Sequence, residues 1–108
     1  MIPTNSDPAW YLYILDCDGR YYYTGITTDV ARRLCQHRSG KTPGARATRG
    51  FQRIEPAYTV AFDTRALAQR AEYRLKKLLR EEKRRIVEDQ PTAAQLLRRL
   101  GVIHQEED

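Results

Sequence analysis

Two strand-like segments on either side of a tight turn constrain the fold of this chain most. Residues 10–16 alternate so that large side chains occupy both faces of a strand, with Trp10, Leu12 and Ile14 on one face. Residues 20–26 form a second, tyrosine-rich strand, and the Asp-Gly pair between the two segments favours a turn. We therefore predict an antiparallel hairpin whose side chains are used on both faces of the sheet.

The length of that turn decides whether Tyr13 and Tyr23 share a face of the sheet. Side chains on paired strands share a face only when they lie opposite each other or an even number of residues away. A two-residue turn would place Tyr23 on the far face. A three-residue loop of Cys17, Asp18 and Gly19 sets the two tyrosines directly opposite, with the glycine supplying a positive φ. We predict this loop because a site that uses both phenols requires it, although packing alone also accounts for tyrosines in a strand.

Capping and breaking residues predict the next two elements. Thr28 is the predicted N-cap of a helix that runs to Gly40, with Asp29 at its positive end. Residues 40–51 contain glycine, proline and basic residues, and we predict a mobile basic loop there. Residues 56–62 form the predicted third strand.

A long helix follows the third strand. Asp63 or Thr64 caps it, and its apolar residues recur at helical spacing to about Arg80, with a bend or break near Glu81. Thr92 caps a short last helix. The order β-β-α-β-α-α predicts an α/β fold of the α+β kind, in which helices flank one small three-stranded antiparallel sheet.

The length of 108 residues allows one domain with one core. We expect an N-terminal tail at residues 1–9, the domain at residues 10–90, and a short helix with a frayed end at residues 91–108. No apolar run approaches the length of a membrane span, and the N-terminus lacks the regions of a signal peptide. We therefore expect a soluble, cytoplasmic protein in which Cys17 and Cys35 are buried thiols and not a disulfide.

Positive charge is concentrated in one part of the chain. The net charge is +5, and residues 65–85 alone carry nine lysines and arginines against Glu72, Glu81 and Glu82. A solvated helix face with internal ion pairs explains such a run, and so does a surface that binds a polyanion. Composition leaves both explanations open and favours an acidic substrate class.

Three residues on the predicted helices have side chains suited to phosphate chemistry. Arg33 and His37 lie four positions apart on one flank of the apolar arc of their helix, where a guanidinium can hold a phosphate. Glu72 lies at the margin of the buried arc of the long helix, and Mg²⁺ takes one or two carboxylates with water and phosphate oxygens. An exposed arginine, an exposed histidine and a helix ion pair are the alternatives.

Residue by residue, this pattern resembles the GIY-YIG nuclease superfamily, and most closely its small stand-alone bacterial YhbQ-like branch. Tyr11-Leu12-Tyr13 and Tyr23-Thr24-Gly25 stand where the two tripeptide motifs of the family fall. Arg33 follows at the spacing of the family's phosphate-site arginine, and His37 matches a histidine of several branches. Glu72 matches the family's metal-ligand glutamate.

The resemblance implies an endonuclease that hydrolyses phosphodiesters of nucleic acid, DNA in preference to RNA, with Mg²⁺ or Mn²⁺ as cofactor. It implies that Glu72 is the metal ligand and that Arg33 bears the negative charge of the transition state. Tyr13 or Tyr23 takes a proton from water. A free phenol has a pKa of about 10, so this base needs help from the metal, Arg33 or His37.

The basic residues around this site are the predicted contacts to nucleic acid, and they are Arg32, Lys41, Arg46, Arg49 and Lys76. A nucleic-acid-binding module that keeps the fold without cleavage is the alternative. Many active branches carry an asparagine beyond the glutamate, whereas the only asparagine of this chain is Asn5. A third possibility is a protein-interaction domain that uses the leucines of the last helix.

Overall fold

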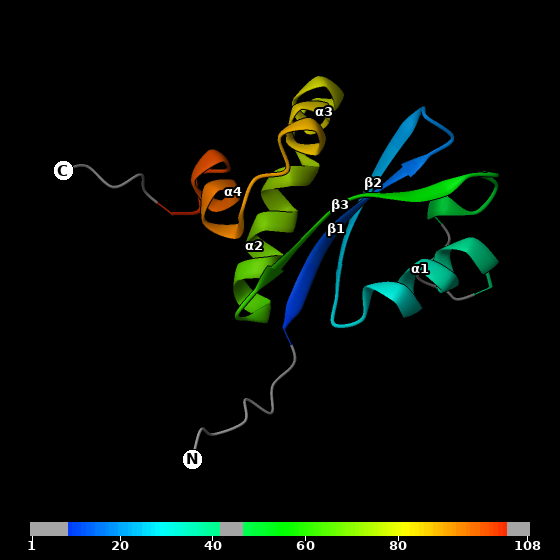
Figure 1. The fold of residues 1–108 in the computed structure, drawn as a ribbon, viewed down its shortest axis with the longest axis horizontal. Coiled ribbons are helices and arrows are strands. Elements are labelled where there is room, and N and C mark those ends of the chain that lie inside the picture. The colour runs from blue at the N-terminus through cyan, green and yellow to red at the C-terminus, as the bar shows by residue number, and fades with distance from the viewer. Residues whose placement is uncertain (1–8, 42–46, 104–108) are drawn as a thin grey trace, which may run out of the picture.

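β1 runs through the centre of a three-stranded antiparallel sheet, with β2 on one side and β3 on the other. The computed structural model describes residues 9–41 and 47–103. Figure 1 shows the order of its elements, which are β1 (Trp10–Cys17), β2 (Tyr21–Thr27), α1 (Val30–Ser39), β3 (Ile54–Phe62), α2 (Arg65–Lys76), α3 (Arg80–Asp89) and α4 (Ala93–Arg99). The predicted α+β fold is confirmed.

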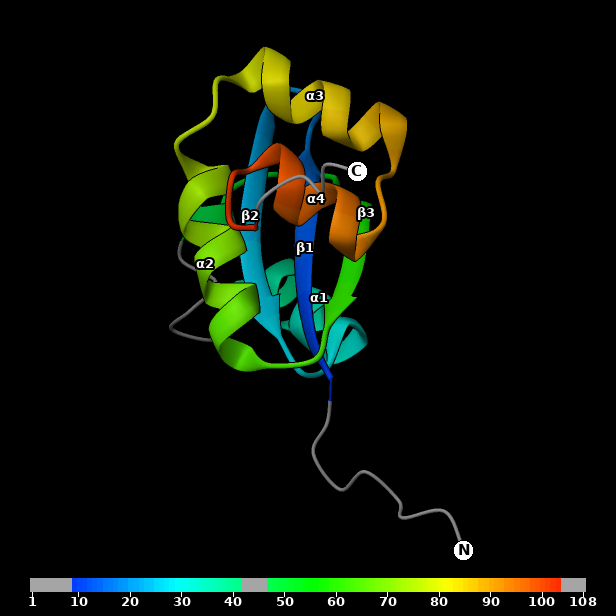
Figure 2. The same cartoon turned by 90° about the vertical axis from the view of Figure 1, so that its left-hand side faces the viewer.

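The two faces of β1 enter two separate cores. Leu12 and Ile14 pack with buried residues of α2, α3 and α4, which Figure 2 shows in front of the sheet. Tyr13 and Leu15 point the other way and pack near Leu34 of α1, behind the sheet. The alternation in the sequence therefore predicts the layers correctly, because successive side chains of a strand point to opposite faces.

The predicted register of the hairpin is wrong by two residues. Tyr13 lies opposite Gly25 and Tyr23 lies opposite Leu15, with Cys17 paired to Tyr21. The loop still has three residues, but they are residues 18–20, not 17–19. Because a shift of two residues keeps each side chain on its face, Tyr13 and Tyr23 still share one side of the sheet.

Asp18 explains why the loop begins one residue later than predicted. Asp18 and Gly19 both have positive φ angles, of 56° and 69°, and Arg20 N donates to Cys17 O over 3.0 Å. The Asp18 carboxylate accepts hydrogen bonds from the backbone N–H groups of Gln52 and Arg53, at 3.2 and 2.6 Å. These bonds tie the turn to the chain that leads into β3, and they keep Cys17 within β1.

Two helix boundaries differ from the sequence prediction. The N-cap of α1 is Asp29 and not Thr28, because the Asp29 carboxylate accepts from Arg32 N. The predicted long helix, which Thr64 caps, ends at Lys76 and not at about Arg80, and α3 begins after Leu79 as a separate helix. The Glu82 carboxylate accepts from Leu79 N and so stabilises the start of the separate helix α3.

The thiols and the helices allow two further comparisons with the sequence predictions. Cys17 is buried and Cys35 is exposed, and both are free. The prediction of two buried thiols is therefore wrong for Cys35, because α1 turns this side chain to solvent. Within the described ranges, no helix combines the length and the apolar character needed to span a membrane.

Candidate active site

Tyr13 lies across Gly25, the glycine of the second motif. A Cβ atom at Gly25 would lie 2.4 Å from the Tyr13 hydroxyl and 2.6 Å from the carbon that carries it. Any side chain at this position would therefore displace the tyrosine ring. The glycine is needed here for space, because Tyr13 is only 2 % exposed and has no room to move away.

Gly25→Ala is expected to destabilise the fold by about 1–3 kcal/mol, the usual cost of forcing extra atoms into a packed core. Urea unfolding measures this loss. The same substitution should cost less in a Tyr13→Leu background, because the clash with the ring is then absent. Equal costs in both backgrounds would show that the contact between Tyr13 and Gly25 does not restrict this position.

A buried chain of hydrogen bonds joins Tyr13 to α1 and to the segment before β3. The Tyr13 hydroxyl lies 3.0 Å from His37 Nε2, and His37 Nδ1 lies 2.8 Å from Thr48 Oγ1. All three side chains are at least 98 % buried. Arg33 also hydrogen-bonds to Tyr13. The tautomer of His37 sets the direction of both bonds, because the phenol of Tyr13 and the hydroxyl of Thr48 can each donate or accept.

This arrangement corrects the predicted placement of α1. The sequence placed Arg33 and His37 at a flank, beside a buried arc that included Ala31 and Cys35. In the structure, His37 is the buried residue of α1, whereas Ala31 and Cys35 are exposed. The helix is turned so that His37 joins Leu34 on the side that faces the sheet, and Tyr13 and Thr48 satisfy both nitrogens of His37.

Burial keeps His37 neutral. Desolvation, and after it the positive charge of Arg33, lowers the pKa of His37 to about 4. Desolvation also raises the pKa of Tyr13 to about 12, and the hydrogen bond from Arg33 opposes that rise. At neutral pH the pair is therefore a neutral phenol bonded to a neutral imidazole.

Acidification is expected to destabilise the protein through His37. The unfolded histidine has a pKa of about 6.5 and binds a proton that the folded protein excludes until the pH falls to about 4. The free energy of unfolding should therefore fall with pH across this window, by at most about 1.4 kcal/mol per pH unit. Urea unfolding at several pH values measures the slope. His37→Gln should flatten it, while a His104→Gln control should not; equal slopes in wild type and His37→Gln would contradict this origin.

Arg33 brings positive charge to the phenol of Tyr13. It is half-buried, hydrogen-bonds to Tyr13, and donates through one guanidinium nitrogen to Gln36 Oε1 over 2.8 Å. These bonds hold the guanidinium of Arg33 in place near Tyr13. A guanidinium held in one orientation can receive a phosphate with little further loss of side-chain freedom.

Tyr23 is the more exposed of the two tyrosines. Its ring lies 6.3 Å from the ring of Tyr13 and 4.8 Å from that of His37, in both cases measured between centroids. The side chain is half-buried, whereas Tyr13 is buried. The structure therefore brings both tyrosines of the two motifs against His37, and it leaves Tyr23 closer to solvent.

Glu72 reaches this site from α2. Its negative charge is the smallest of the causes that act on the pKa of Tyr13, so the carboxylate lies within electrostatic range of the phenol. The side chain is 22 % exposed, and Lys76 Nζ lies 3.2 Å from Glu72 Oε2. α2 packs against β2 and β1 from the face of the sheet opposite α1. A partly buried carboxylate of this helix therefore lies within electrostatic range of the site.

The predicted nucleic-acid contacts have different surroundings. Arg32 and Lys41 are exposed, and Lys76 is the ion-pair partner of Glu72. Arg49 is exposed, and its Nε donates to Gly40 O over 3.1 Å. Arg46 lies outside the described residues. The structure therefore places Lys76 beside the site.

Sequence reasoning missed the contribution of Thr48. It lies in the segment predicted to be a mobile loop, yet it is fully buried against His37. Phe51 in the same segment stacks on Tyr21, with ring centroids 5.7 Å apart. A threonine between glycines carries no sequence signal for such a role, because the role depends on a histidine eleven positions away.

A buried Tyr–His pair, an arginine that acts on the phenol and a carboxylate from the next helix occur together on this α+β fold. The family model described as the GIY-YIG catalytic domain matches residues 9–85 of this chain. The chain belongs to the GIY-YIG family.

Relatives of similar length support this membership. A UPF0213 protein of Cupriavidus necator is 49 % identical over 80 residues, which are 74 % of this chain and 85 % of the relative. A UPF0213 protein of Yersinia pestis is 45 % identical over 86 residues, covering 80 % of this chain and 88 % of the relative. A protein of E. faecalis, solved in solution by NMR, is 30 % identical with a TM-score of 0.53, and the match covers 97 % of this chain and 99 % of the other.

Proposed function

We propose that this protein is a divalent-metal-dependent endonuclease that hydrolyses phosphodiester bonds of nucleic acid, DNA in preference to RNA. The observation that carries the proposal is that Tyr23, Arg33 and His37 surround the Tyr13 phenol, with the charge of Glu72 within electrostatic range of it. Packing explains buried tyrosines, but it does not explain an arginine and a carboxylate brought to the same place. Hydrolysis of a phosphodiester uses all of them.

Arg33 is the phosphate-binding residue in this proposal. Its guanidinium is already oriented by Tyr13 and Gln36, and it carries a permanent positive charge. Negative charge builds on the phosphate oxygens as water attacks. A fixed cation at this position stabilises the transition state more than the bound substrate.

Tyr23 is the proposed general base, and Tyr13 is the residue that positions Arg33. Tyr13 is buried, is bonded to both Arg33 and His37, and has a pKa of about 12. Such a phenol exchanges protons with water poorly. Tyr23 has the same chemistry in a half-buried place against His37, where water can reach it. After losing its own proton to solvent, Tyr23 accepts a proton from the attacking water.

Glu72 is the proposed ligand of the metal. In the described part of the chain, no three histidine, cysteine, aspartate or glutamate side chains lie close enough together to hold a metal ion. A cation here therefore depends on Glu72, water and substrate oxygens. Mg²⁺ is commonly held in that way, and a carboxylate at the edge of the core fits it. Bound there, Mg²⁺ would supply Lewis-acid charge to the phosphate. Mn²⁺ suits the same oxygen ligands.

The second candidate is a nucleic-acid-binding module without cleavage. It is favoured by the absence of asparagine beyond Glu72, since the only asparagine of the chain is Asn5. Binding needs the cations of the surface, but it has no use for a carboxylate near a phosphate. A carboxylate within electrostatic range of Tyr13 therefore favours the nuclease.

Cleavage of labelled substrates tests the proposal. Purified protein with Mg²⁺ is incubated with single-strand, duplex, flap and junction DNA and with matching RNA, with EDTA as the metal control. The nuclease predicts metal-dependent cuts in at least one substrate and none with Glu72→Ala. Binding without any cut across the panel would favour the second candidate.

A further inference from the structure

Tyr73 is an exposed aromatic ring on α2. Its residue is 63 % exposed, which is unusual for a large hydrophobic side chain, and Lys77 Nζ lies 4.3 Å from the centre of the ring. The ammonium group therefore sits over the ring in a cation–π contact. An aromatic face with a cation beside it is a surface on which a base can stack next to its phosphate.

Two arginines border the same surface. Arg70, Tyr73 and Arg74 line a hollow of about 360 Å³ on α2. Arg70 donates to Val102 O over 3.5 Å, and Arg74 donates to Leu100 O over 3.1 Å. Because their partners are neutral carbonyls, the guanidinium groups are held in place and keep their net charge. We refer to Arg70, Tyr73, Arg74 and Lys77 as the Tyr73 platform.

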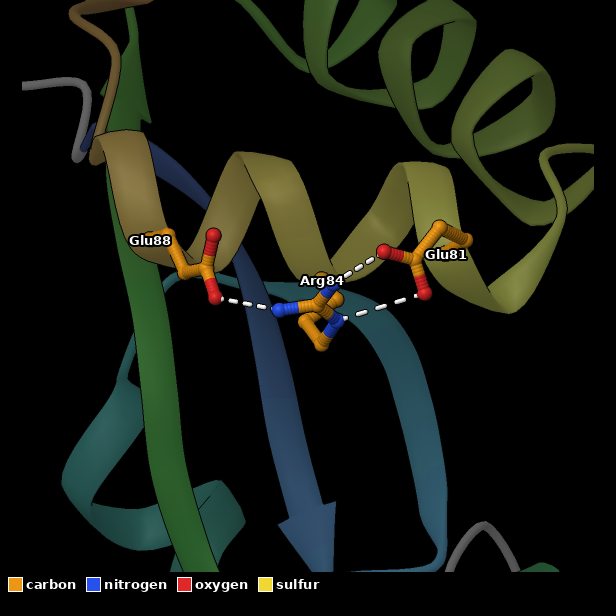
Figure 3. Close-up of polar contacts among 3 residues, drawn as sticks. All are labelled: Glu81, Arg84 and Glu88. Atoms are coloured by element: carbon orange, nitrogen blue, oxygen red, sulfur yellow. Dashed lines mark hydrogen bonds and ion pairs between the residues drawn. The ribbon is translucent and has the colours of Figure 1, made fainter.

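The cations of α3 are in a different electrostatic state. Arg84 forms ion pairs with Glu81 on one side and Glu88 on the other (Figure 3). The helix carries four basic and four acidic residues, so its charges compensate one another. In α2, Glu72 is the one acidic residue. The excess positive charge of residues 65–85 therefore belongs to α2 and its end.

We propose that the Tyr73 platform binds an unpaired strand of the nucleic acid substrate. Tyr73 follows Glu72 directly in α2, but successive side chains of a helix point about 100° apart, and the platform lies on the face of α2 that bonds to the segment after α4. In a duplex each base already stacks on its neighbours, so the ring can stack only on a base that is unpaired or at an end. The platform would select substrates with a single-stranded segment. This inference rests on the proposed nuclease function and names its substrate class.

Arg70, Arg74 and Lys77 would hold the phosphates on either side of the stacked base. Such contacts do not depend on the sequence, because they are made to the backbone and because every base has an aromatic face. The selection is therefore for strand structure and not for base sequence. The charge of the platform fits a polyanion, and an apolar protein partner would not require three cations around one ring that form no ion pair with the residues the structure describes.

Fluorescence anisotropy of labelled DNA, in EDTA and with the full chain, tests the platform without any need for cleavage. Two probes are compared, a blunt duplex and the same duplex with a single-stranded thymidine overhang. Tyr73→Ala is expected to weaken binding of the overhang probe about tenfold and to leave the blunt duplex unchanged. Tyr73→Phe should bind both probes like the wild type, because it keeps the aromatic face.

Charge-matched variants separate the platform from general electrostatics. Lys77→Gln and Arg84→Gln each remove one positive charge, but only Lys77 lies on the platform. Lys77→Gln should weaken binding of the overhang probe more than Arg84→Gln does. The proposal is overturned if Tyr73→Ala binds the overhang probe with unchanged affinity, or if it loses affinity equally for both probes. Tyr73 is exposed, so its variants should fold, and circular dichroism checks this. The proposed nuclease fails separately, if the wild type cuts no substrate.

Discussion

Glu72→Gln should abolish Mg²⁺-dependent cleavage and leave substrate binding intact. Glutamine keeps the size of the side chain and removes the charge that holds the metal. We expect a loss in kcat on the order of 10³-fold, the scale on which removal of one electrostatic contact to a transition state is felt. Affinity in EDTA should stay the same or rise slightly, because one negative charge near the phosphates is gone. Single-turnover cleavage and anisotropy on the same probe measure both quantities.

The matched control is Glu81→Gln. Glu72 pairs with Lys76 and Glu81 pairs with Arg84, so each substitution removes one carboxylate from an ion pair within a helix. Figure 3 shows the pair on α3. Exposed pairs contribute about 0–1 kcal/mol, so both variants should unfold at nearly the same urea concentration as the wild type. Only Glu72→Gln should lose cleavage. Full activity in folded Glu72→Gln would leave Glu72 as an ion-pair partner and remove the proposed metal ligand.

The fold follows from sequence patterns because its local signals agree with the packing. Alternation in residues 10–16 specifies a strand with two buried faces, and the helical spacing after Thr64 specifies a covering helix. The caps at Thr64, Thr92 and Gly40 are also where the sequence placed them. These features depend on neighbours within one or two turns of chain, and such neighbours are visible in a sequence.

The register and the orientation of α1 depend on distant partners. The hairpin loop begins at Asp18 because the carboxylate binds backbone groups at Gln52 and Arg53. α1 turns His37 inward because Tyr13 and Thr48 bond to its two nitrogens. Neither set of bonds follows from residue spacing, since each joins segments that only the folded chain brings together.

The site was predictable as a set of residues, but their roles were not. The pattern of two tyrosine motifs, an arginine and a glutamate identifies the participants. It leaves the two tyrosines equivalent. The structure separates them, because Tyr13 is enclosed by Gly25 and His37, whereas Tyr23 remains half-buried at the open side. Enclosure is a property of the tertiary packing, so the division of labour between the tyrosines appears only there.

Tyr23→Phe and Tyr13→Phe are therefore expected to fail in different ways. Tyr23→Phe removes the proposed base, and cleavage should fall by about 10²–10⁴-fold, the usual contribution of a positioned acid or base. Its stability should match the wild type, because the hydroxyl has no part in the buried hydrogen-bond chain from Tyr13 to Thr48. Tyr13→Phe leaves His37 Nε2 buried without its partner, which costs about 1–3 kcal/mol. Its cleavage should fall less, through poorer positioning of Arg33.

Single-turnover rates and urea unfolding on the same preparations distinguish the two tyrosines. The expected pattern is a stable, inactive Tyr23→Phe and a destabilised, partly active Tyr13→Phe. The reverse pattern, a folded but inactive Tyr13→Phe and an active Tyr23→Phe, would assign the base to the buried phenol. His37 would then have to accept the proton of Tyr13 in spite of a pKa of about 4, with Arg33 stabilising the phenolate that forms. In that case the buried chain from Tyr13 to Thr48 would carry the proton, and it would not serve only to position Arg33.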